Sequence, residues 1–136
     1  MPFAGGLVAF VKLRARVQGQ AKTALLGALS GAAYWLKLTI AVDDDIDTES
    51  VRDVLWSIAS RTHAEIDVGM MDGMRMLHAD PSSLSAQDGA GAERIGTRWF
   101  IDSTMPALSQ PERRATFERA MPKNFAGVHL RDHKFS

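Results

Sequence analysis

The fold is decided by one stretch of sequence, Leu38-Thr-Ile-Ala-Val-Asp-Asp-Asp-Ile-Asp-Thr-Glu-Ser-Val-Arg-Asp-Val-Leu-Trp-Ser-Ile-Ala-Ser-Arg61. A short apolar run that favours β-structure leads directly into a cluster of carboxylates. Apolar residues then recur at helical spacing as far as the final arginine. A strand, an acidic loop and a helix in this order form a unit at which α/β proteins commonly build a site.

The same alternation of strands and helices continues on both sides of this stretch. We predict strands over residues 7–13, 36–42, 64–70 and 98–102, and helices over residues 21–31, 49–60 and 111–121. Strands that alternate with helices pair in parallel through right-handed crossovers. The predicted fold class is therefore α/β, a mostly parallel sheet flanked by helices. We expect a single domain over residues 1–136, with a long loop at 72–94 and a polar tail at 124–136.

The starts and buried faces of the later helices can also be predicted. For the helix over residues 49–60 the expected N-cap is Asp47 or Thr48. Its expected core face consists of the apolar residues at helical spacing, Val51, Val54, Leu55 and Ile58. The last helix is expected to open with a capping box, Ser109-Gln-Pro-Glu112.

Composition excludes several classes of function. Lys plus Arg and Asp plus Glu each number 16 in the 136 residues, so the basic excess that nucleic-acid binding needs is missing. There is no cysteine, and hence no disulfide or thiolate nucleophile. The apolar segment 24–42 approaches the length of a membrane span, but Lys37 and two glycines interrupt it, so we expect no membrane span. We see no targeting segment and expect a cytoplasmic protein.

The acidic cluster has two possible roles. Carboxylates such as Asp43, Asp44, Asp45 and Asp47 are the ligands that Mg²⁺ prefers, and a strand that ends in paired aspartates resembles the acid pocket of a phospho-receiver. A receiver also needs a strand-end Lys after a segment such as 102–104, and none follows. Alternatively, the carboxylates favour a helix N-terminus and solvate a loop.

Two other groups of residues could contact a partner or a ligand. Methionine adapts to irregular apolar surfaces, so Met70, Met71, Met74 and Met76 indicate either core filling or a contact surface beside the long loop. His129 and His133 have the spacing of a helical metal pair, but without a third ligand they are expected to be solvated tail residues. We find no credible catalytic set among the residues.

Several motifs together resemble the carboxy-terminal domain of the UbiD family of decarboxylases. The strongest are residues 40–47 and 54–61, which resemble the family pattern VVDDDID … VLWAIATR. Other family motifs are resembled in the same order, between about residues 7 and 122, by Val17-Gln-Gly-Gln-Ala-Lys22, Ala79-Asp-Pro-Ser82, Ile101-Asp-Ser-Thr-Met-Pro106 and residues 111–119. Two positions depart from the family: Gln20 replaces a histidine and Met105 replaces a lysine.

The resemblance implies an accessory or small subunit of a heteromeric decarboxylase or carboxylase. Prenylated FMN with a divalent metal would be carried by a larger UbiD-like catalytic subunit, and the substrates would be aromatic or α,β-unsaturated carboxylic acids. On this chain we expect no catalytic, flavin-binding or metal-binding residue. The expected contacts with the substrate pocket or the larger subunit are Met70, Met71, Met74, Met76, Asp80, Pro81 and Ser82.

Two alternatives remain open. The acidic cluster could make the chain a stand-alone metal-binding or phosphate-binding module. The chain could also be a degenerate relative that associates only with itself and has no catalytic role.

Overall fold

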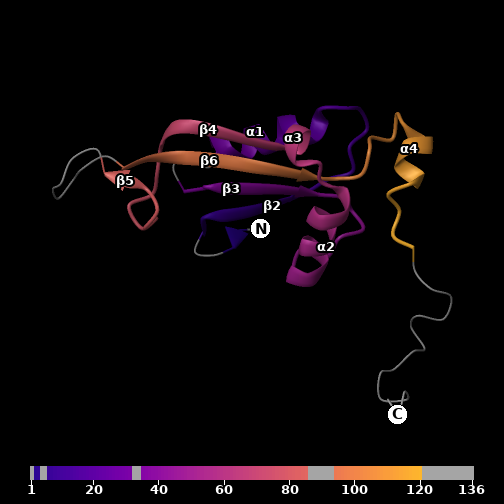
Figure 1. Ribbon diagram of the computed structural model, residues 1–136, viewed down its shortest axis with the longest axis horizontal. Coiled ribbons are helices and arrows are strands. Elements are labelled where there is room, and N and C mark those ends of the chain that lie inside the picture. Colours follow the sequence, from indigo (N-terminus) through magenta and orange to yellow (C-terminus); the bar gives the residue numbers. More distant parts are fainter. Residues whose placement is uncertain (1, 4–5, 32–34, 86–93, 121–136) are drawn as a thin grey trace, which may run out of the picture.

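A mixed β-sheet forms the centre of this computed structural model, which describes residues 2–3, 6–31, 35–85 and 94–120 (Figure 1). The sheet has the strand order β1-β2-β3-β6-β4, and β5 also pairs with β6. β2, β3 and β6 run parallel, whereas β1, β4 and β5 join them in antiparallel pairs. The strands are β1 (Pro2–Phe3), β2 (Val8–Lys12), β3 (Leu38–Val42), β4 (Val68–Arg75), β5 (Leu84–Ser85) and β6 (Arg94–Ser103).

Helices lie on both faces of the sheet, so the predicted fold class is confirmed. On one face, α1 (Gln20–Gly31) packs Ala21 and Leu25 against the middle of β3. On the other face, α2 (Val51–Arg61) packs Val54 into a cluster with residues of β3 and β6. In Figure 1, α2 covers only the carboxyl end of the parallel strands. Two short helices, α3 (Ala64–Asp67) and α4 (Pro111–Ala115), complete the part of the chain that the structure describes.

The apolar segment 24–42 is divided between two elements, as the sequence predicts. Its first part belongs to α1 and its last part to β3. Across the described ranges, no helix combines the length and the hydropathy that crossing a membrane requires.

The start and the buried face of α2 differ from the prediction. Its N-cap is Ser50, whose hydroxyl accepts a hydrogen bond from the Asp53 amide at 3.3 Å, and not Asp47 or Thr48. Val51 and Leu55 are 57% and 59% exposed, so the expected core face is wrong at these two positions. The buried stripe contains Val54 together with two polar residues, Ser57 and Arg61, each of which has hydrogen-bond partners at the carboxyl end of the sheet. Those partners are distant in sequence, so apolar periodicity does not reveal them.

The segment predicted as a third parallel strand is also different. Residues 64–67 form α3, and β4 starts only at Val68 and runs antiparallel to β6. β4 continues to Arg75, into the predicted loop, with an irregular register between Met71 and Met74 and a positive φ of 69° at Gly73. β5 lies inside the same predicted loop, and β6 begins four residues earlier than expected. Residues 86–93 of that loop lie outside the described residues.

The last helix is shorter than the sequence suggests. α4 ends at Ala115, and its N-cap Gln110 makes no side-chain capping bond, so the predicted capping box does not form. The Ser109 amide donates instead to the Arg16 carbonyl at 3.1 Å, which attaches this segment to the end of β2. The predicted tail at 124–136, with His129 and His133, lies outside the described residues.

Candidate functional site

The first carboxylate of the acidic cluster is a buried structural partner. Asp43, directly after β3, is fully buried and accepts a hydrogen bond from Arg114 Nη2 at 2.6 Å. The amides of Asp44 and Met105 donate to the same carboxylate at 3.0 and 3.1 Å. Burial alone would raise the pKa of Asp43, but the hydrogen bonds from Arg114 and Asp44 lower it overall. Asp43 is therefore held as an anion with its acceptor positions in use.

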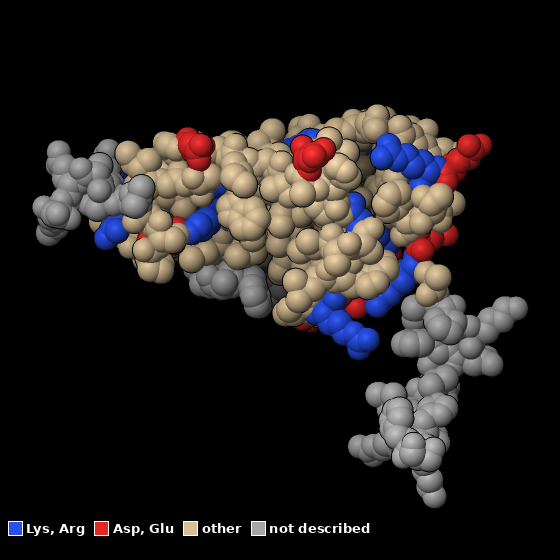
Figure 2. Space-filling model, viewed as in Figure 1, with Lys and Arg blue, Asp and Glu red and all other residues tan. Residues whose placement is uncertain are grey.

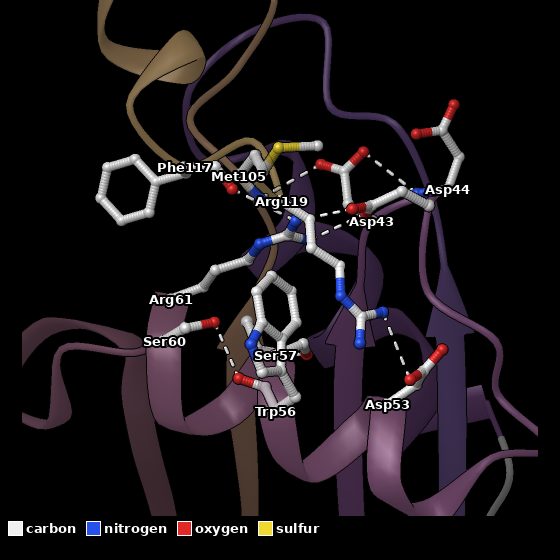
Figure 3. A network of polar contacts seen from close by, with 12 residues as sticks. Asp43, Asp44, Asp53, Trp56, Ser57, Ser60, Arg61, Met105, Phe117 and Arg119 are labelled. Atoms are coloured by element: carbon white, nitrogen blue, oxygen red, sulfur yellow. Dashed lines mark hydrogen bonds and ion pairs between the residues drawn. The ribbon is translucent and has the colours of Figure 1, made fainter. Parts of the chain in front are cut away.

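The third carboxylate is paired in the same way. Asp45 makes two hydrogen bonds to the guanidinium of Arg61, at 2.8 and 2.6 Å, and these lower the pKa of Asp45. The Arg61 side chain is fully buried and also donates to the Phe117 carbonyl at 3.2 Å. Figure 3 shows that Arg61 and Arg119 both lie over the Trp56 ring, at 5.0 and 4.6 Å from its centroid. Such cation–π contacts add to the ion pairs.

These pairings do not fit a metal ion. Carboxylate oxygens of Asp43, Asp44 and Asp45 lie within 4.8 Å of one another, a spacing that could hold a cation. However, Asp43 and Asp45 are already neutralised by arginines, and the exposed Asp44 has two longer ion pairs, at 3.7 Å from Arg14 Nε and at 4.0 Å from Arg114 Nη2. A cation would have to displace two guanidinium groups that are themselves buried. Among the described residues, the acidic cluster is thus a set of structural ion pairs.

A cavity of about 710 Å³ lies next to this cluster, at the carboxyl ends of β2 and β6. Pockets at this position are typical of α/β sheets. The cavity is lined by residues of the first turn of α1, of α3 and of α4, and by Asp102 and Thr104 at the end of β6. Asp102 accepts hydrogen bonds from the amide and hydroxyl of Thr104, at 3.1 and 2.7 Å, but burial raises its pKa overall. The sequence analysis included Asp102 in a receiver-like segment and in the family motif over residues 101–106, but gave it no role of its own.

The four methionines do not form one surface. Met70 lies opposite Trp99 in the ladder, on the face that α2 partly covers, and is 71% exposed. Met71 and Met74 lie opposite Arg98 and Gly96, and Arg98 donates to the Leu29 carbonyl of α1, so these two methionines are on the α1 face. The irregular register between them changes the alternation that the sequence suggests. Met76 is buried.

The segment Asp80-Pro-Ser82 is anchored to the sheet through one side chain. Asp80 is buried and forms an ion pair with Lys37 at 2.9 Å, and Lys37 also donates to the Ser82 hydroxyl. Burial tends to raise the pKa of Asp80, but the hydrogen bonds from Lys37 and Ser82 lower it overall. Pro81 and Ser82 are exposed. Of the seven expected contact residues, Met70, Pro81 and Ser82 are the ones that the structure leaves exposed.

A row of apolar side chains crosses the part of the sheet that α2 does not cover. Val8, Leu38, Trp99 and Met70 lie opposite one another on β2, β3, β6 and β4, so they point to the same face. The first three are only partly buried and Met70 is largely exposed. Figure 2 shows that charged side chains gather at the end of the molecule that carries α2 and α4, and are sparse over its middle. We call these four residues the apolar row.

The arginines that complete the acidic cluster were missed by the sequence analysis. Arg61 was placed just after the predicted helix over residues 49–60 and Arg114 within the last predicted helix, and neither was given a role. The signal that could have found Arg61 is its inward position on α2, seven residues after Val54. Arg114 reaches Asp43 from 71 residues away, and no local pattern shows that contact.

Comparison with known proteins gives a consistent family. A model of the 3-octaprenyl-4-hydroxybenzoate carboxy-lyase C-terminal domain matches residues 1–103. An anhydromevalonate phosphate decarboxylase of Archaeoglobus fulgidus is 32% identical over 96 residues, which are 71% of this chain and 20% of that protein.

Two solved structures share the fold. The UbiD-class enzyme HmfF from Pelotomaculum thermopropionicum, in complex with FMN, matches with a TM-score of 0.71 and 27% identity over 93% of this chain and 26% of that one. Vanillic acid decarboxylase ShVdcCD of Sedimentibacter hydroxybenzoicus, in an open form with truncated ShVdcD, matches with a TM-score of 0.65 and 26% identity, over 90% of this chain and 25% of that one. The chain thus spans between a fifth and about a quarter of the length of these proteins.

Proposed function

This chain belongs to the UbiD family of carboxy-lyases, whose C-terminal domain it matches, and we propose that it works as the small, accessory subunit of a heteromeric decarboxylase or carboxylase. A larger UbiD-like subunit would carry prenylated FMN with a divalent metal, in the cytoplasm. The substrates would be aromatic or α,β-unsaturated carboxylic acids. In this proposal the accessory subunit helps to close the substrate pocket and to assemble the oligomer.

The similar proteins support the reaction class, the flavin and the assembly in this proposal. The Archaeoglobus relative is a decarboxylase, HmfF was solved with FMN, and the Sedimentibacter enzyme decarboxylates an aromatic acid. That enzyme was also solved with truncated ShVdcD, which supports assembly from more than one component. The arginine-paired carboxylates of the acidic cluster do not suit a metal, and we propose that the metal and the flavin bind to the larger subunit.

The apolar row is the observation that carries the proposal. Val8, Leu38 and Trp99 are partly buried against the core and Met70 is largely exposed, and in Figure 1 α2 lies over the other end of the strands. Contiguous apolar residues that stay accessible are typical of a protein interface. Among the residues that the structure describes, Met70 is the most exposed of the large apolar side chains. We propose that the larger subunit packs on this row, so that the open sheet face becomes an interior.

Co-expression with a larger UbiD-like subunit tests the proposal. We expect the two chains to co-elute in gel filtration and the complex to decarboxylate a phenolic acid faster than the larger subunit alone. Met70→Asp should weaken co-elution because it places a charge in an apolar interface. Leu26→Asp is the matched control, since Leu26 is 43% exposed but lies on α1, on the opposite face. If the chains elute separately and activity does not depend on this chain, the proposal is wrong.

Self-association through the same apolar row is a second candidate function. It predicts that the chain alone forms a dimer that Met70→Asp dissociates, and that adding the larger subunit leaves this dimer intact. The subunit proposal predicts instead that the larger subunit binds the apolar row more tightly than a second copy does, and so dissociates any dimer. Gel filtration of the chain with and without its partner separates the two.

A further inference from the structure

One segment at the carboxyl end of the sheet is attached mainly by polar contacts. Residues 106–119, which we call the strap, contain α4 and cross the ends of β2 and β3. From residue 108 to residue 119 the only buried side chain is that of Arg114, which is charged. Apolar burial is the main favourable term that fixes a segment to a core. The strap lacks this term over most of its length.

Within the described ranges, five hydrogen bonds attach the strap to the rest of the molecule. Arg114 reaches Asp43 at 2.6 Å, and Arg119 reaches Asp53 at 3.3 Å. Arg61 of α2 donates to the Phe117 carbonyl at 3.2 Å. At the start of the strap, the amides of residues 108 and 109 donate to carbonyls just after β2, at 2.9 and 3.1 Å. The buried contact between Arg114 and Asp43 is the shortest of these, and the pairs nearer the surface are weaker.

The strap is also one wall of the cavity at the carboxyl ends of the strands. Gln110, Arg113 and Phe117 line the cavity opposite α1, and Asp102 lines it from β6. Displacing the strap would therefore expose Asp102 and the first turn of α1 to solvent. The strands themselves are held by their own ladders and by the clusters on both faces of the sheet, to which the strap contributes no residue.

We propose that the strap is a latch, which lifts from the sheet as a unit while β3 and β6 stay folded, and so opens the cavity. The pair of Asp43 and Arg114 is its catch. Segments with little apolar burial open locally at a lower free energy than the core that carries them. The latch does not depend on the proposed function, because it needs neither a partner nor a cofactor.

Single cysteines in the full chain test the latch, since the protein has no cysteine of its own. Ala107→Cys places a thiol in the buried start of the strap, and Ala41→Cys places one in the buried middle of β3. The reaction rate of each thiol with an aromatic disulfide reagent is measured in the otherwise unchanged chain. The same rates are then measured with Asp43→Asn, and with Asp44→Asn as the matched control at the exposed neighbouring carboxylate.

We expect the strap thiol to react at least about tenfold faster than the strand thiol, because local opening precedes unfolding. Asp43→Asn should accelerate the strap thiol by about a further tenfold and leave the strand thiol unchanged. Asp44→Asn removes only a 4.0 Å contact with Arg114 and should change both rates much less. Equal rates for both thiols in every background would overturn the latch, because the strap would then open only with the whole fold. If Asp43→Asn fails to fold, Arg114→Lys loosens the same pair. Hydrogen exchange then provides a second measurement: the amides of residues 108–117 should exchange faster than those of β3, and equal rates would overturn the latch.

Discussion

The two ends of β3 lie in very different surroundings. After β3 ends, Asp43 and Asp45 are each bound by a buried arginine, so the charges at that end are satisfied within the chain. Where β3 begins, Leu38 joins the apolar row, at the end of the strands that α2 does not cover in Figure 1. One end of the sheet is completed internally and the other presents apolar surface. The difference indicates that the acidic motif maintains the fold, and it leaves the apolar row as the surface on which we propose that a partner packs.

Loss of Arg114, the partner of Asp43, should have the largest effect on stability. Arg114→Met leaves a buried carboxylate without its counter-charge, and breaking such a pair costs about 3–5 kcal/mol. We expect a loss of about 3 kcal/mol in the free energy of unfolding, at the lower limit, because displacement of the strap lets water reach Asp43. Urea denaturation followed by circular dichroism measures it. Asp44→Asn should change the unfolding free energy little, and a similar loss in both variants would remove the distinction between the two carboxylates.

Charge in the apolar row should affect association and not folding. Met70→Asp is expected to weaken binding of the larger subunit by about 10- to 100-fold, as for a central interface residue. Its unfolding free energy should change by less than about 0.5 kcal/mol, since Met70 is 71% exposed. Titration calorimetry and urea denaturation on the same sample measure both quantities. A variant that folds normally and binds normally would show that the apolar row is not the interface.

Acid should weaken the charged end selectively. The pKa values of Asp43 and Asp45 are lowered in the folded protein, so their contribution to stability is complete above the unfolded value of about 3.8 and is lost as pH falls through the folded values. We therefore expect the unfolding free energy to fall below about pH 4. Asp43→Asn should flatten this part of the profile. An unchanged profile in that variant would assign acid sensitivity to other carboxylates.

The smallest effect on stability is expected from Asp102, near the end of β6. Burial raises the pKa of Asp102, so ionisation opposes folding and stability is lost as pH rises through the raised value. Asp102→Asn should slightly stabilise the protein at pH 7 and have no benefit at pH 3, where the carboxyl is protonated. Thermal denaturation at both pH values measures this. Destabilisation at pH 7 would show that the bonds from Thr104 outweigh the burial.

The success of sequence analysis followed the range of the interactions. β2 and β3 were predicted because each is a short apolar run whose local preference and burial agree. Residues 64–67 were taken for a strand because four residues give no clear period, and their helical turn depends on the bond from the His63 amide to Asp67. The apolar face of α2 was wrong because Ser57 and Arg61 are buried through partners far along the chain. No local pattern contains the partner of Asp43.

The long sequence separation of Asp43 and Arg114 also has a consequence for the order of events during synthesis. At roughly 5–20 residues per second, the ribosome needs roughly 4–14 s to extend the chain by the 71 positions from Asp43 to Arg114. During that interval β3 can pair with β2 and receive α1, but its terminal carboxylate has no counter-charge and must remain hydrated. The carboxyl end of β3 therefore matures late, and a nascent chain that stalls before Arg114 carries an acidic strand end without its arginine.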